Sequence, residues 1–194
     1  MNNKQAGFTI VELLIVIIIT VLVATIFFQF ASVSIGQYIR LQTDASRNAN
    51  MASQSQRIAK VVRGATSITS AGAYDMQLYS YFYPSDTYVS QTRYYLDATK
   101  TVLKVDVTPM SANPPQGSPL AGQTRTYTII PQYYYSSTTS LFNYLDASGN
   151  TLTQPISDLN AIKMVKINLA AKDTRSTTQS LSLQVNLRNK KTNL

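Results

Sequence analysis

Hydrophobic and polar positions divide the chain into three parts. Residues 8–28 are apolar apart from three threonines and Glu12, the only charged residue of this run. An α-helix of about 20 residues spans the roughly 30 Å hydrocarbon core of a bilayer, so this run predicts a transmembrane helix. The helical pattern continues to Arg63, and Gly64 is its predicted end. The predicted inner face of this continuation is Leu41, Ala45, Asn48, Ala52, Ser55, Ala59 and Val62.

From Tyr74 onward the period changes to two, which predicts β-strands. The clearest strand alternates Leu181, Leu183, Val185 and Leu187 with polar residues. Further strands are predicted at 76–83, 102–107, 124–130, 140–145 and 161–169, and residues 109–122, with four prolines, predict an exposed loop. The predicted fold class is α+β, with a long N-terminal helix packed on an antiparallel β-sheet.

A short repeat marks two turns in this β-rich part. The segment Tyr95–Thr99, with sequence YLDAT, recurs as YLDAS at Tyr144–Ser148. In each copy we expect the aspartate, Asp97 or Asp146, to accept hydrogen bonds within a turn between strands. Alternating oxygen ligands after Asp146 also fit a calcium loop, but no bidentate acid closes it, so a turn is the better prediction.

Composition excludes several kinds of chemistry. The chain has no cysteine and no histidine, so disulfides and nucleophilic catalysis by Cys-His or Ser-His pairs are ruled out. We expect no enzymatic activity, no cofactor and no metal site. The net charge of +8 favours anionic partners such as nucleic acid, lipid headgroups or acidic surface polymers.

The N-terminal residues resemble a known motif. Gly7-Phe8-Thr9-Ile10-Val11-Glu12 follows a short polar leader that contains Lys4, and Glu12 is the fifth residue counted from Phe8. This arrangement looks like the cleavage and methylation motif of type IV prepilins and type II secretion pseudopilins. The layout of the β-rich part is similar to the W-type minor pilin and J-type pseudopilin group.

The resemblance implies a role for each motif residue. A prepilin peptidase and methylase would cut between Gly7 and Phe8 and methylate the new amine of Phe8, with Lys4 as the leader charge. Glu12 would then pair with the Phe8 amine of a neighbouring subunit during assembly. The alternative for Glu12 is an acid favoured at the start of a helix by the helix dipole. A secretory signal peptide cut near Ser32–Ser34 is a further alternative, although the apolar run is long for one.

The expected organisation follows from these assignments. Residues 1–7 are a leader, 8–35 a transmembrane and filament-core helix, 36–63 an amphipathic extension, and 64–194 an extracytoplasmic β-rich domain. The expected location is a single-pass cytoplasmic membrane protein before assembly and a cell-surface filament afterwards. The expected partners are other pilin subunits, the prepilin peptidase, an inner-membrane assembly platform and membrane lipid.

Three functions are compatible with the sequence. The first is a structural subunit of a pilus-like filament, with a length that favours a minor pilin. The second is a DNA-uptake or adhesion tip subunit or a secretion pseudopilin, and the third is a surface protein that never polymerises. Tyrosines beside arginines are candidates for surface binding, because aromatic rings and guanidinium groups stack on bases and sugars. The candidate surface-binding residues are Tyr79, Tyr81, Tyr83, Arg93 and Arg125. The alternative is that these tyrosines half-bury on a sheet face.

Overall fold

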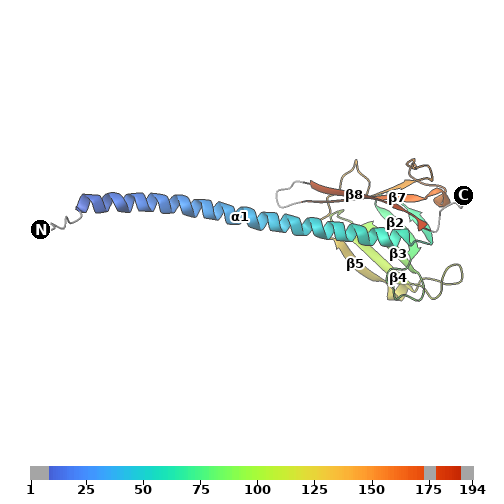
Figure 1. Cartoon of the computed structure of the whole chain (residues 1–194). Coiled ribbons are helices and arrows are strands. Elements are labelled where there is room, and N and C mark those ends of the chain that lie inside the picture. Colours follow the sequence, from blue (N-terminus) through green and yellow to red (C-terminus); the bar gives the residue numbers. More distant parts are fainter. Residues whose placement is uncertain (1–8, 173–177, 189–194) are drawn as a thin grey trace. The chain divides into compact units, whose positions relative to one another are not determined.

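The computed structural model describes residues 9–172 and 178–188, and within them one long helix precedes a set of antiparallel strands (Figure 1). Helix α1 runs from Ile10 to Arg63, and Gly64 ends it by donating its N–H to the Lys60 carbonyl at 3.1 Å. The predicted helix and its predicted end are therefore confirmed. The fold is α+β and pilin-like, with the helix packed against antiparallel sheets.

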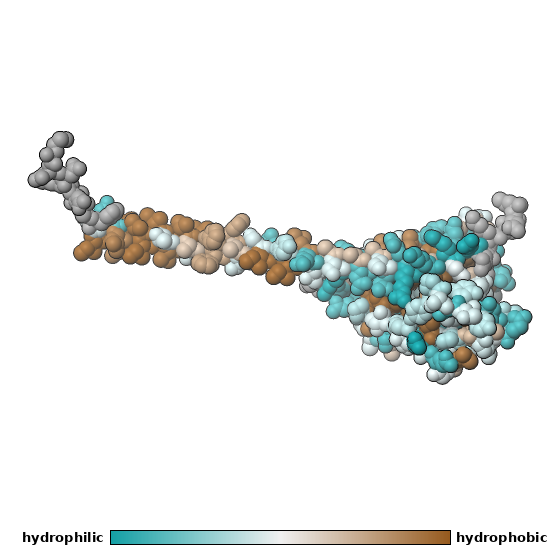
Figure 2. Space-filling model, turned by 60° about the horizontal axis from the view of Figure 1, so that its bottom comes forward, coloured by the Kyte–Doolittle hydropathy of each residue, from teal (hydrophilic) through white to brown (hydrophobic). Residues whose placement is uncertain are grey.

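The chain divides into two compact units, Met1–Ala45 and Ser46–Leu194, and the division falls inside α1. In the first unit the large apolar side chains from Ile10 to Leu41 are all exposed. Figure 2 shows these apolar residues on the surface of the N-terminal part of the helix. The second unit contains the last turns of α1 and both sheets.

The second unit holds two antiparallel sheets where a single sheet was predicted. The first has the order β1-β2-β3-β4-β5, a simple meander, and the second has the order β6-β7-β8. The strands are β1 (Ser67–Ala71), β2 (Asp75–Ser80), β3 (Ser90–Leu96), β4 (Leu103–Pro109), β5 (Arg125–Ile130), β6 (Phe142–Leu145), β7 (Met164–Lys172) and β8 (Thr178–Asn186). Short 3-10 turns lie at Ala121–Gln123 and Leu159–Ala161.

The buried face of α1 differs from the predicted one. Met51, Ser55, Ile58, Ala59 and Val62 are buried at spacings of three and four, which places them on one side of the helix. The prediction was right from Ala52 onward but wrong for the first three positions, because Leu41, Ala45 and Asn48 are exposed. The prediction favoured small residues, whereas the large side chains of Met51 and Ile58 fill the space against the sheets.

Both sheets contribute to the same hydrophobic core. Met76 and Leu78 of β2, Val105 of β4, and Val165 and Ile167 of β7 have no measurable exposure. Strand alternation explains this burial, since every second residue of a strand points to the same face. The sequence prediction located these three strands, implied β3 only as the strand that leads into the YLDAT turn, and missed β1, in which Ile68 is the only large apolar residue.

Both repeat turns form, but only the first joins two strands: after Asp146 the chain makes a single bridge, Leu145↔Thr151, and the next strand begins at Met164. Asp97 accepts hydrogen bonds from the Thr101 and Val102 N–H groups at 3.0 Å, between β3 and β4. Asp146 accepts from the Ser148 and Asn150 N–H groups at 2.8 and 2.9 Å. These internal donors occupy both carboxylates, so each aspartate closes its own turn.

The two turns also share a backbone conformation. Lys100 (φ 57°) and Gly149 (φ 86°) occupy the same position of the repeat, both in the left-handed region. Glycine adopts this region without steric cost, whereas lysine does so at some cost. The turn geometry is therefore set by the aspartate rather than by the residue at this position.

Candidate functional site

The start of α1 places Glu12 opposite Thr9. The Thr9 carbonyl accepts the first helical hydrogen bond, from the Leu13 N–H at 3.2 Å, so Thr9 is the residue that caps the helix. The Glu12 N–H donates to the Thr9 hydroxyl oxygen at 3.3 Å, and the Glu12 carboxylate accepts from the Thr9 N–H at 3.4 Å and from its hydroxyl at 3.3 Å. This reciprocal arrangement is a capping box, the T-x-x-E signature of a helix start.

The capping box leaves Glu12 available to another partner. All three contacts are at the long end of the hydrogen-bond range, where the interaction is weak. The Glu12 side chain is exposed and stands at the edge of an apolar surface. The helix-start role considered from the sequence is thus present in this structure, and it coexists with an open carboxylate. Lys4, Gly7 and Phe8 lie outside the described residues.

The apolar segment after Glu12 is long and apolar enough to cross a membrane. Its most hydrophobic 18-residue window has a mean hydropathy of 3.0, and none of that window is buried in the structure. Thr20 and Thr25 donate their hydroxyls to the carbonyls of Val16 and Val21, at 2.7 and 2.8 Å. These bonds satisfy the two hydroxyls within the helix itself, which lowers the cost of placing them in hydrocarbon.

The five candidate surface-binding residues do not form one cluster. Tyr79 and Arg93 lie on the face of the first sheet that points away from its buried aliphatic residues, as the pairs Gln77↔Arg93 and Tyr79↔Gln91 show. Tyr83 and Arg125 line a cleft at the other face. Tyr81 follows β2 and is 46% exposed.

On the outer face, Arg93 is held by neighbours on its own sheet. Its guanidinium forms an ion pair with Asp75 and lies 5.0 Å from the centre of the Tyr95 ring. The hydrogen bond with Asp75 raises the pKa of Arg93, so the arginine stays charged. Both partners of the pair are substantially exposed, and the net charge they present is near zero.

The cleft gathers aromatic and basic groups instead. Its volume is about 290 Å³, and its lining includes Tyr83, Tyr88, Arg125 and Tyr127. The Tyr83 hydroxyl donates to the Tyr127 hydroxyl oxygen at 2.8 Å, and Phe82 stacks on the Tyr127 ring. The cleft is therefore an aromatic recess with a guanidinium group at its wall.

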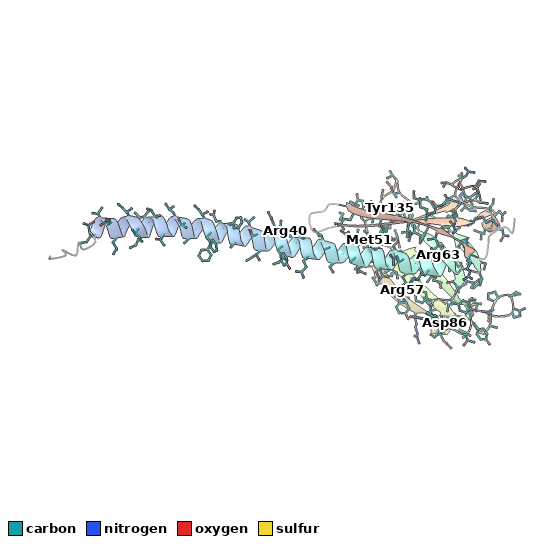
Figure 3. All side chains as sticks on the ribbon, in the orientation of Figure 1. Arg40, Met51, Arg57, Arg63, Asp86 and Tyr135 are labelled. Atoms are coloured by element: carbon teal, nitrogen blue, oxygen red, sulfur yellow. The ribbon has the colours of Figure 1, made fainter. Side chains whose placement is uncertain are left out.

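A second arginine adds to this positive field. Arg57, from the helix, lies 5.0 Å from the centre of the Phe82 ring. Figure 3 labels Arg57 on the helix and Asp86 in the loop after β2. The hydrogen bond from Tyr83, followed by the influence of Arg125 and Arg57, lowers the pKa of Tyr127. Asp86 offsets part of the charge but already accepts the Tyr83 N–H at 3.0 Å.

Sequence reasoning missed part of this cleft. The predicted surface-binding residues do not include Tyr127, which lines the cleft, or Arg57, which lies beside it. The signal was present in part, because Arg125 and Tyr127 alternate on one strand and therefore share a face. The contact of Arg57 with Phe82 joins a helix to a loop, and no local sequence pattern predicts it.

Comparison with known proteins gives one match. A family model described as the prokaryotic N-terminal methylation motif matches residues 2–28. The chain carries a prepilin-type methylation motif. No curated protein and no solved structure matches the chain. The motif supports the type IV pilin, or prepilin-type, family, and with it a pilin-like or pseudopilin precursor that prepilin peptidase processes. The apolar helix and this motif together fit membrane anchoring and assembly with other pilins.

Proposed function

We propose that this protein is a structural subunit of a type IV pilus-like filament, a minor pilin with its β-rich unit outside the cytoplasm. The observation that carries the proposal is Glu12, an exposed carboxylate at the start of a helix whose following apolar surface has no cover in the described chain. A carboxylate in hydrocarbon costs on the order of 2.5–3.5 kcal/mol near the bilayer centre, so it needs a compensating partner.

Processing would create that partner. Cleavage between Gly7 and Phe8 exposes an α-amine whose reference pKa is near 8, so it is mostly protonated at neutral pH. A buried charge is costly alone and tolerable when it is paired. The Phe8 amine of a neighbouring subunit would satisfy Glu12, and the pair would set the axial offset between helices. Lys4 leaves with the leader.

Two substitutions separate this role from helix capping. Glu12→Ala removes the carboxylate, and Thr9→Ala removes the hydroxyl partner but keeps the carboxylate. Glu12→Ala should still be cleaved, yet fall at least about tenfold in sheared filaments, since a lost charge partner in an apolar site costs more than 1.4 kcal/mol. Thr9→Ala should weaken only a cap, worth about 1 kcal/mol, and should remain in filaments.

The readouts are the amount of each variant in sheared filaments and its processed fraction in membranes. Thr9→Ser, which keeps the hydroxyl, is the control for a change so close to the cleavage position. Equal losses for Glu12→Ala and Thr9→Ala would show that the capping box explains Glu12. Normal incorporation of Glu12→Ala into filaments would rule out the proposed pairing of Glu12 with the Phe8 amine.

A second function, binding of DNA or another acidic polymer at the cell surface, is favoured by the cleft. Tyr83, Tyr88 and Tyr127 provide stacking surfaces, and Arg125 provides a charged donor at the same wall. Arg57 adds a second positive charge nearby, 5.0 Å from the centre of the Phe82 ring, which itself stacks on Tyr127. This function is compatible with the first, because the cleft lies in the β-rich unit, which the first proposal places outside the cytoplasm.

Retention of double-stranded DNA by the full chain in detergent tests this second function. Binding should weaken steeply with salt, and Arg125→Gln should reduce the slope of log affinity against log salt by about 1. Arg93→Gln is the matched control, since Arg93 lies on the opposite face in an ion pair with Asp75. Equal effects of the two changes, or binding independent of salt, would remove the cleft as the binding site.

A further inference from the structure

Strand β8 is an edge strand without the protection that other edges of this protein carry. The other three edge strands are short or irregular. Strand β1 has five residues and a register shift, and β6 has four residues. Strand β5 has six residues, carries Arg125 and has a register shift opposite Leu103. By contrast, β8 has nine residues, TQSLSLQVN, with no charge and no proline. Its register with β7 continues without a shift over all nine pairs. Long, flat, uncharged edges pair with other strands unless something prevents it.

The hydrogen bonds of β7 show which backbone groups of β8 remain open. The Asn168 N–H donates to the Leu141 carbonyl at 2.8 Å, and the Ala170 carbonyl accepts from the Tyr134 N–H at 2.9 Å. Both bonds lie on the β6 side, so even-numbered residues of β7 face β6 and odd-numbered ones face β8. The register pairs odd residues with odd, for example Ile167 with Leu183.

It follows that the even-numbered residues of β8 turn their N–H and C=O groups away from β7. Their side chains are also exposed, whereas the odd-numbered ones are half-buried or buried against the core. The residues with outward backbone groups are Thr178, Ser180, Ser182, Gln184 and Asn186. Within the described part of the chain, β8 has no strand on this side.

We propose that β8 pairs with β8 of a second copy of this chain, antiparallel and centred on Ser182. This register uses all nine residues and places Thr178 opposite Asn186 and Ser180 opposite Gln184 of the copy. Every outward N–H then meets an outward C=O. The two three-stranded sheets join into one.

The side chains of β8 are complementary to themselves in this register. On the inner face Leu181 of one copy lies opposite Leu183 of the other, with Gln179 opposite Val185, and the polar face brings together serine, threonine, glutamine and asparagine. Apolar cross-strand pairs stabilise a sheet, and the absence of charge removes the repulsion that identical edges would otherwise suffer. A second copy is therefore the partner that the chemistry of this edge fits.

This pairing is separate from assembly through α1 and does not depend on the proposed function. A two-fold antiparallel pair holds copies whose strands run in opposite directions. Subunits of a polar filament all point the same way. In a chain that assembles as proposed, the pair would therefore link copies from two different filaments.

Single cysteines test the register, because the chain contains none of its own. In the proposed pair, Ser182 faces Ser182 with a Cα–Cα distance of about 5.5 Å, which suits a disulfide. Ser182→Cys in the full chain in detergent should form a disulfide dimer under mild oxidation. Ser180→Cys alone should not, since its two copies lie roughly 13 Å apart along the strands. When the Ser180→Cys chain is mixed with a Gln184→Cys chain that carries a larger tag, the two chains should form a disulfide-linked mixed dimer.

A charge at the centre of the edge gives a second readout. Ser182→Lys places two like charges opposite each other and should lower the yield of the Ser180→Cys and Gln184→Cys mixed dimer about fivefold. Ser53→Lys, at an exposed helix position, is the control and should leave the yield unchanged. The unfolding midpoint of each variant checks that its fold is intact.

The result that supports the proposal is a dimer of Ser182→Cys, none of Ser180→Cys alone, and a yield sensitive to Ser182→Lys only. The proposal is overturned if Ser182→Cys stays monomeric or if Ser180→Cys alone dimerises equally well. It is also overturned if the two lysine variants behave alike. If copies associated only through α1, Ser182→Lys would leave the amount of dimer unchanged.

Discussion

The two ends of helix α1 have similar secondary structure and opposite environments. Near its start, residues such as Leu14 and Ile18 are more than half exposed in a segment that is apolar all round. Near its end, Ile58 and Val62 are fully buried, and the exposed residues are polar or charged, among them Arg57, Lys60 and Arg63. A helix that is apolar on every side needs an apolar environment, either lipid or other helices, whereas a one-sided helix needs one protein core.

The two ends of the helix therefore bury their apolar surface against different partners. The second unit folds around its own core, so its apolar burial is satisfied within the chain. The first unit has no core of its own among the described residues, so the same driving force acts on whatever lies outside the chain. The N-terminal segment thus needs lipid or another chain to bury its apolar surface, whereas the β-rich unit buries its apolar surface within its own core.

Matched leucine substitutions give the largest expected contrast between the two regions. Leu78→Ala removes a fully buried side chain and should lower the free energy of unfolding of the second unit by about 2–5 kcal/mol. Leu22→Ala removes the same atoms from a side chain that is 59% exposed and should change that free energy by less than about 0.5 kcal/mol. Denaturant titration of the full chain in detergent, followed by tyrosine absorbance, measures both.

The tyrosine signal reports on the second unit, since every tyrosine except Tyr38 lies at or beyond Tyr74. Leu22→Ala should instead weaken assembly, which sheared-filament yield measures. If Leu22→Ala destabilised the second unit as much as Leu78→Ala, the two regions would not be energetically separate, and the comparison would fail.

Alkaline pH should affect the two regions differently, with a smaller effect. Burial raises the pKa of Tyr133 to about 12, and burial also raises those of Tyr94 and Tyr144. A group whose folded pKa is raised stabilises the fold at low pH and loses that contribution as the pH rises, here from about 10, the pKa of free tyrosine, towards 12.

The second unit should therefore lose stability progressively between about pH 10 and 12, while α1 before Tyr38 contains no tyrosine to ionise. Tyrosinate absorbance followed together with sheet circular dichroism tests this. Tyr133→Phe, which cannot ionise, should flatten the decline in that window. Stability that is flat from pH 8 to 12 in the unsubstituted protein would contradict the burial of these hydroxyls.

Much of this architecture was predictable because its signals are local. The apolar run, the helix end at Gly64 and the aspartate turns each depend on a few neighbouring residues. Glu12 stood out because a single charge in an apolar run has an energetic cost that needs a reason. The helix cap formed by Thr9 has the same local character, since the T-x-x-E spacing is itself its signature.

The features that sequence did not predict depend on contacts between distant segments. The division into two sheets is set by the pairing of β6, β7 and β8, and alternation alone does not assign partners to strands. The buried face of α1 was misplaced because Met51 and Ile58 fit a space that the sheets create. The contact of Arg57 of the helix with Phe82 of a distant loop, next to the cleft, likewise joins segments far apart in the sequence.

The most direct test of the central claim is the mass of the N-terminal peptide of the protein recovered from its native membrane or filaments. The account predicts a chain that begins at Phe8 with a methylated amine, so that Glu12 becomes its fifth residue. A chain that still begins with Met1, or one that begins at Ile35 after removal of the whole apolar segment, would contradict it.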